Sequence, residues 1–134
     1  MRSHWLKALG HAKWSLPDAW LDDERGTERL RRTGFPRRPR IEPGDRLVYY
    51  ASGWKSVFAV VEAVEPPTDE HPISERWPWT VAVEPLLVVP LLSNAPPVEA
   101  LGVPPRSMSQ QSHIRLSPEH YARAVEAIAS VAAS

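Results

Sequence analysis

Residues 44–64, GDRLVYYASGWKSVFAVVEAV, constrain the fold more than any other part of the chain. A proline-glycine-aspartate turn at 43–45 leads into a β-branched and aromatic run at 47–51. A short connector containing Gly53 separates it from a second run, 57–64, which has almost no polar residue. Two such runs joined by a short glycine-containing loop are typical of a β-hairpin. Because the second run is so apolar, we expect this hairpin to lie buried at the centre of the domain.

Length and composition favour one globular domain without a membrane segment. With 134 residues, the chain is long enough to bury its own core, and we expect a single domain over 1–134. It has no cysteine, which excludes disulfides, thiolate chemistry and the usual zinc sites. The first ten residues lack an apolar signal region, and no stretch approaches the ~20 apolar residues of a membrane helix. We therefore expect a cytoplasmic protein.

Further short elements flank the hairpin. Alternation predicts a strand at 3–9, and Pro17 at a first helical turn predicts a helix that Gly26 breaks. Thr27 is a suitable cap for a second short helix over 28–33, and the three prolines in 35–43 indicate an extended, basic crossing. After the hairpin we expect a strand from 80 to 89 with a bulge or edge position at Pro85. One helical turn at 98–101, a strand at 112–116 and a final helix beginning at 117–118 complete the pattern.

These elements predict an α+β fold. Its five to six short strands would form a twisted sheet that curls into a small barrel, with helices after the first and last strands.

The order of several features resembles the EVE domain of the PUA-like superfold, the group that also contains the YTH readers of methylated RNA. The features are the early strand with Trp5, the Trp14-Ser15 pair, the central hairpin, the Trp77-Pro78-Trp79 segment before a valine-rich strand, and the closing strand before a helix. The resemblance covers nearly the whole chain. It implies a PUA-like pseudo-barrel with a pocket for a flipped, modified nucleobase. It also implies a non-catalytic reader of modified DNA or RNA, often bacterial.

The resemblance also implies site residues. In YTH domains a Trp-Ser pair after the first strand supplies one cage wall and polar contacts, which falls here on Trp14 and Ser15. A second tryptophan at the start of a later strand supplies the other wall, which falls on Trp79 or Trp77, and we favour Trp79. The basic crossing at 35–43 departs from the family, which usually has a more helical, amide-containing segment there. No amide contact is therefore carried over.

The tryptophans point to the same chemistry independently of the resemblance. Five of the six lie in predicted loops or at element ends: Trp14, Trp20, Trp54, Trp77 and Trp79. Stacking of a base on such a side chain is worth roughly 1–3 kcal/mol per base. Trp54, in the hairpin connector, is as compatible with covering the barrel end as with touching a ligand, and Trp77 and Trp79 are equally suited to stacking on Pro78. Trp5 is expected in the core. Polar loop groups for the edge of a base are Ser15, Ser52, Ser109 and Gln110.

Six arginines within residues 29–40 form the main basic cluster. Arg37, Arg38 and Arg40 have few acidic neighbours and are our candidates for phosphate contacts, with Lys55. The alternative is a solvated face paired with the acidic residues at 22–28.

Catalytic motifs are absent from the sequence: it has no GxSxG elbow, P-loop or HExxH. We therefore expect no cofactor, no metal and no enzymatic activity, and a DNA or RNA partner that carries a modified base. Two alternatives remain open. One is an RNA-cleaving enzyme like some ASCH-type relatives, and the other is a protein-interaction module that uses the tryptophan-rich loops.

Overall fold

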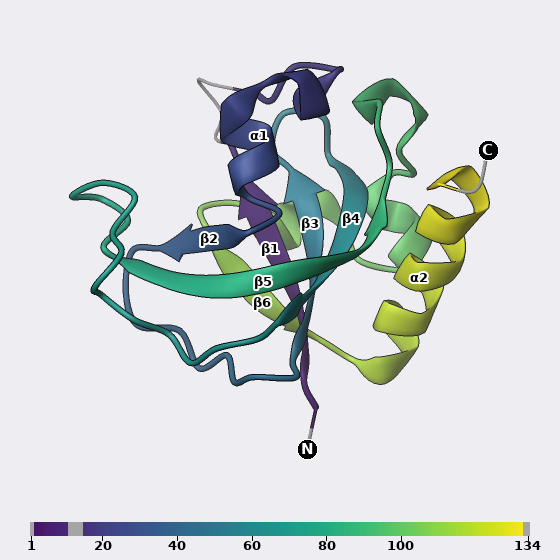
Figure 1. Ribbon diagram of the computed structural model, residues 1–134. Helices are drawn as coiled ribbons and strands as arrows, with labels where there is room; N and C mark the ends of the chain where they lie inside the picture. The colour runs from purple at the N-terminus through teal and green to yellow at the C-terminus, as the bar shows by residue number, and fades with distance from the viewer. Residues whose placement is uncertain (1, 11–14, 133–134) are drawn as a thin grey trace.

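The computed structural model describes residues 2–10 and 15–132 and contains one curled, six-stranded sheet (Figure 1). The strand order is β2-β5-β4-β3-β1-β6. The parallel β1–β3 pair is flanked by antiparallel pairs on both sides. The strands are β1 (His4–Leu9), β2 (Arg32–Phe35), β3 (Arg46–Ala51), β4 (Ser56–Ala63), β5 (Trp79–Val88) and β6 (His113–Leu116). In Figure 1 the long β5 crosses in front of β1, which shows the curl. The expected α+β, PUA-like pseudo-barrel is confirmed.

The predicted hairpin is the centre of this sheet. β3 and β4 pair antiparallel from Arg46 opposite Glu62 to Ala51 opposite Ser56, and every residue of β4 except Glu62 is buried. The turn between them needs left-handed backbone, with φ of 87° at Gly53 and 58° at Lys55. The apolar sequence of β4 is explained because side chains on both faces of this central strand are buried.

β5 contains the irregularity that its proline predicts. The register of the β4–β5 pair shifts between Val60 and Val61, which lie opposite Leu87 and Pro85. β2 pairs only with the first part of β5, from Trp79 to Ala82. Pro85 therefore lies at a bulge and beyond the end of β2, where a missing N–H leaves no partner unsatisfied.

The prediction of a second helix over 28–33 is wrong. The helix α1 (Glu24–Glu28) ends before that range, and β2 begins at Arg32. Thr33 and Phe35 are fully buried, and β2 gains backbone hydrogen bonds from β5. This tertiary pairing overrides the local helical preference of the segment.

The first predicted helix is divided in two. A 3₁₀ turn, η1 (Trp20–Asp22), precedes α1, and the side chain of Asp23 caps α1 by accepting a hydrogen bond from the Arg25 N–H at 2.9 Å. Gly26 lies within α1 rather than ending it. A Cβ there would lie 2.2 Å from the carbonyl oxygen of Trp20, so glycine permits α1 to pack on this turn.

The second half of the chain closes the barrel on one side. Three 3₁₀ turns, η2 (Leu92–Asn94), η3 (Val98–Leu101) and η4 (Pro105–Met108), precede β6. The helix α2 (Pro118–Ala132) follows and flanks the sheet at the right of Figure 1. As predicted, Ser117 caps it, because its Oγ accepts a hydrogen bond from the His120 N–H at 3.1 Å. No helix among residues 2–10 and 15–132 is long and apolar enough to cross a bilayer.

Aromatic side chains fill the interior and join the two edge strands. Phe35 on β2 meets His113 on β6 edge to face, with ring centroids 4.9 Å apart. Trp5 also contacts His113, at 5.5 Å, and its indole N–H donates to Asp45 at 3.0 Å. Trp5 is buried, as expected for a core residue. Side-chain contact across the mouth of the curl thus replaces the hydrogen bonds that would close a full barrel.

Candidate functional site

A partly open cavity of about 300 Å³, here called the inner cavity, lies where β1 ends. The helix α1, the strand β2 and the 66–78 loop contribute its other walls. Its lining is predominantly apolar, with three cationic side chains among it: Lys7, Ala8, Leu9, Gly10, Leu16, Arg25, Arg29, Gly34, Ile73 and Trp77. No aspartate or glutamate belongs to this described lining. Such a cavity is at the lower end of the size range of small-molecule pockets.

Lys7 is the most unusual residue of the inner cavity. Its side chain is only 3% exposed, and its Nζ donates to the Ala8 carbonyl at 2.8 Å. The Nζ also lies 4.9 Å from the centre of the Phe35 ring and 5.4 Å from that of Trp77. Burial, with a smaller contribution from the charge of Arg29, lowers the pKa of Lys7 to about 7. A substantial fraction of this amine is therefore neutral near physiological pH.

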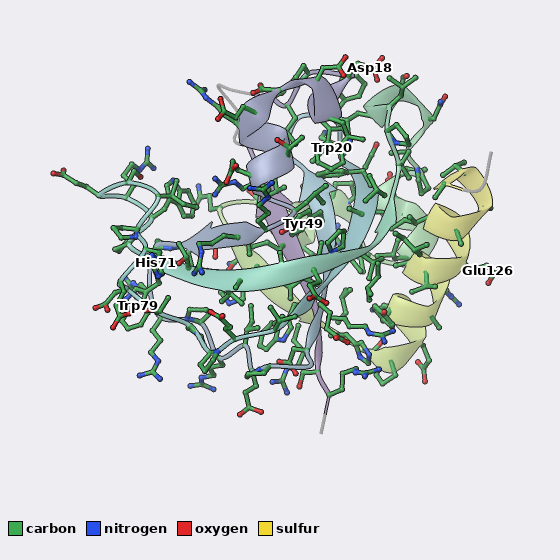
Figure 2. The ribbon with its side chains drawn as sticks, in the orientation of Figure 1. Asp18, Trp20, Tyr49, His71, Trp79 and Glu126 are labelled. Carbon is green, nitrogen blue, oxygen red and sulfur yellow. The ribbon has the colours of Figure 1, made fainter. Side chains whose placement is uncertain are left out.

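The groups around Lys7 are also shifted toward their neutral forms. Burial, followed by the charge of Lys7, lowers the pKa of His113 to about 4. Burial raises the pKa of Tyr49 well above its usual value, and its hydroxyl donates to the carbonyl of Arg29. Figure 2 shows Tyr49 in the middle of the curled sheet. The interior next to the cavity thus offers little compensating negative charge.

Trp77 forms an aromatic wall of the cavity, and a tight loop positions it. The Ile73 N–H donates to the Trp77 carbonyl, and the Trp77 N–H donates to the Ser74 carbonyl, both at 3.1 Å. A Cβ on Gly34 would lie 2.7 Å from Cδ1 of Ile73 and 3.2 Å from Cβ of Trp77. The glycine in β2 therefore allows this loop to pack against the strand, which places Trp77 at the cavity.

A larger hollow of about 880 Å³, the outer groove, adjoins the inner cavity and shares Ala8, Gly10 and Trp77 with it. It brings together five residues predicted from the sequence: Ser52, Lys55, Trp77, Ser109 and Gln110. Arg76 and Arg106 add positive charge. Among the described residues, Lys55 and Gln110 are the non-glycine positions with positive φ, 58° and 60°. Backbone in such unfavourable conformations concentrates at functional sites.

Other predicted residues lie elsewhere. Trp79 is the first residue of β5, and the guanidinium of Arg38 lies 5.5 Å from the centre of its ring. Trp79 lines neither hollow, and Figure 2 shows it at the far left end of the molecule. Arg37, Arg38 and Arg40 are exposed and also line neither hollow.

Described residues on both sides of Trp14 in the sequence line the inner cavity. Trp14 lies outside the described residues, but Gly10 and Leu16, on either side of 11–15, both line the inner cavity. Ser15 is exposed and packs against the hairpin turn, since its Oγ lies 2.1 Å from the position of a Cβ on Gly53. Trp54 lies outside both hollows, and its indole N–H donates to the Leu16 carbonyl at 2.8 Å.

Sequence reasoning missed Lys7 and Arg25 as cavity residues, and placed Arg29 only in the basic cluster. A lysine in an otherwise apolar strand was the available signal for Lys7. Across residues 2–10 and 15–132, no group of three or more histidines and acids could hold a metal ion.

Solved structures show which fold this is. Rpa0253 from Rhodopseudomonas palustris aligns with a TM-score of 0.59 and 15% identity over 96% of this chain and 94% of its own. Atu2648 from Agrobacterium tumefaciens gives 0.56 and 17% over 96% and 92%. Human THYN1, solved in complex with DNA containing 5-methylcytosine, gives 0.53 and 14% over 92% and 96%. No protein-family model matches the sequence, and no curated protein does. At these identities the likeness shows the fold alone, and that fold is the PUA-like fold of the EVE-domain protein THYN1.

Proposed function

We propose that this protein is a non-enzymatic module that binds a modified nucleobase of DNA or RNA in the inner cavity. The observation that carries the proposal is an apolar cavity of about 300 Å³ that has Trp77 as a wall and opens beside a cationic groove. The similarity in fold to THYN1, which was solved with methylated DNA, supports it. A base extruded from its strand needs this combination of an aromatic surface and a few polar contacts.

In this proposal the base stacks on Trp77. Leu9, Leu16 and Ile73 surround a small added group such as a methyl, and the Lys7 amine faces the polar edge of the base. The opposite wall is assigned to Trp14 as the family resemblance implies, and Gly10 and Leu16, which flank residues 11–15 in the sequence, line the cavity.

The strand itself lies in the outer groove. Lys55, Arg76 and Arg106 contact phosphates, while Ser52, Ser109 and Gln110 supply polar contacts to sugars and neighbouring bases. Arg37, Arg38 and Arg40 form a second basic surface farther from the base. Trp79 supports that surface by holding Arg38 over its ring.

Fluorescence anisotropy on labelled oligonucleotides tests the proposal. The panel contains DNA and RNA with cytosine, methylated or hydroxymethylated cytosine, adenine or N6-methyladenine, at two salt concentrations. We expect one modified base to bind most tightly, and Trp77→Ala to weaken that binding roughly 5- to 150-fold, the equivalent of about 1–3 kcal/mol of stacking. Trp79→Ala is the matched control and is expected to change the affinity for the base less than threefold.

Two outcomes would favour the alternatives. Cleavage of labelled RNA at sub-stoichiometric protein concentration would establish an enzyme in place of a reader. If neither DNA nor RNA binds in a salt-dependent way, the result would instead favour a protein partner that binds the tryptophan-rich loops.

A further inference from the structure

The inner cavity presents a buried primary amine that has no acidic partner among residues 2–10 and 15–132. Lysine is almost never fully buried unless it is paired, yet the contacts of the Lys7 Nζ are the Ala8 carbonyl and the rings of Phe35 and Trp77. The ionisable groups around it are Arg25 from α1, Arg29 directly after α1, His113 from β6 and Tyr49 from β3. None of these groups is a carboxylate.

Two features of this environment make an amine nucleophilic. A lysine is activated when it is desolvated in an apolar pocket or lies beside another cation, because both favour the neutral form with its free lone pair. Lys7 has both, since it is buried in a predominantly apolar cavity and Arg29 acts on it electrostatically. A neutral amine also explains how the protein tolerates this side chain without a counter-ion.

We propose that the Nζ of Lys7 condenses reversibly with an aromatic aldehyde that enters the inner cavity, forming an imine. Trp77 stacks on the aromatic ring and holds its formyl group toward the amine. The apolar walls limit the access of water, which would reverse the condensation.

The step needs no cofactor. The nitrogen lone pair attacks the carbonyl carbon and gives a carbinolamine after proton transfer from nitrogen to oxygen. Loss of the hydroxyl with a second proton releases one water, and a C=N bond forms. No group is oxidised or reduced, and water reverses the reaction.

The aldehyde has two sources that share this chemistry. One is a formyl group on a pyrimidine of a nucleic-acid strand, and this source rests on the proposed function. The other is a free aromatic aldehyde, which needs only the cavity. The two sources are separated by using 5-formylcytosine in an oligonucleotide in one arm and benzaldehyde in the other.

Reduction with borohydride tests the proposal, because it converts the imine into a stable secondary amine that mass spectrometry detects. The chain has three lysines, Lys7, Lys13 and Lys55, so peptide mapping reports selectivity within one sample. We expect the adduct on Lys7 to exceed that on either other lysine more than tenfold in the folded protein. We expect this selectivity to disappear in urea, where all three amines are exposed.

Variants and pH refine the test. Lys7→Met retains an unbranched side chain of similar length in the apolar cavity and is expected to lower total trapping more than tenfold, with its fold checked by circular dichroism. Trapping in the wild type is expected to rise with pH and reach half its maximum near pH 7, where the Lys7 amine loses its proton. Arg29→Gln removes the neighbouring cation and is expected to move this midpoint to higher pH.

The results distinguish this inference from the proposed function. Trapping of both aldehydes on Lys7 supports both, and trapping of benzaldehyde alone supports the reactive amine while counting against a base-binding cavity. Tight binding of a modified oligonucleotide, with no adduct on Lys7 from either aldehyde, would overturn the imine proposal and leave the reader intact. Equal adduct on the three lysines of the folded protein would also overturn it.

Discussion

Replacement of Asp45 tests how β1, which carries Lys7, is held in place. The Asp45 side chain is 2% exposed and accepts hydrogen bonds from the Ser3 N–H at 2.9 Å, the Trp5 indole at 3.0 Å and the Glu42 N–H at 3.1 Å. Asp45→Ala leaves these three donors without an acceptor. The buried indole accounts for about 2–3 kcal/mol, and the two partly buried N–H groups, which water can reach, add about 0.5–1 kcal/mol each. We expect a total loss of about 3–5 kcal/mol in the free energy of unfolding.

Denaturation by guanidinium chloride, followed by tryptophan fluorescence, measures this loss. Asp45→Asn retains one acceptor oxygen but turns an NH₂ group toward the donors, so we expect it to lose about half as much. Asp69→Ala removes an exposed aspartate and is the matched control, with an expected change within about 0.5 kcal/mol. A loss below about 1 kcal/mol in Asp45→Ala would refute the reasoning that this carboxylate clamps β1 to the hairpin.

Two further predictions concern His113 and Gly26. Because the pKa of His113 falls from 6.5 to about 4 on folding, the unfolded chain takes up a proton in this window that the folded protein does not. Stability from this group is therefore complete above pH 6.5 and is lost as the pH falls toward 4. His113→Gln is expected to reduce the loss of unfolding free energy between pH 6.5 and pH 4 by about 2 kcal/mol. This value is discounted because the ring is partly exposed. Gly26→Ala places a Cβ 2.2 Å from the Trp20 carbonyl oxygen and is expected to cost about 2 kcal/mol or more in the free energy of unfolding. Gly44→Ala, with φ of 94° but no atom within 4 Å, is the control and is expected to cost about 1 kcal/mol when both are measured by guanidinium chloride denaturation.

The sequence predicted the parts of the fold that depend on local patterns. The apolar run of β4 cannot be solvated, so it defines the central strand without reference to any partner. Ser117 followed by a proline begins α2 because a serine cap and an N1 proline act within one turn. The bulge beside Pro85 is equally local, since it follows from the missing N–H of proline.

The parts that the sequence did not predict depend on contacts between distant segments. A helix would also tolerate Arg32 and Thr33 of β2, and only the pairing of this strand with β5 decides the outcome. Lys7 and Trp77 are 70 residues apart, and the curl of the sheet brings them within 5.4 Å. Trp20 was grouped with loop tryptophans, but its indole donates to the Val89 carbonyl at 2.8 Å in the interior, a contact between segments 69 residues apart.

The two hollows differ in chemistry, and this separates selectivity from affinity under the proposed function. The inner cavity offers an aromatic wall, apolar contacts and an amine that is partly neutral near pH 7, so its interactions respond weakly to salt. The outer groove offers Lys55, Arg76 and Arg106 to phosphates, and such contacts weaken steeply as salt rises. A change at Trp77 should therefore reduce the preference for a modified base at every salt concentration and leave the salt slope unaltered. A change at Arg76, its neighbour in the chain, should reduce the salt dependence of binding by the contribution of about one phosphate contact. It should leave the preference for a modified base intact. This contrast between adjacent residues follows only if the base occupies the inner cavity and the backbone occupies the adjoining outer groove.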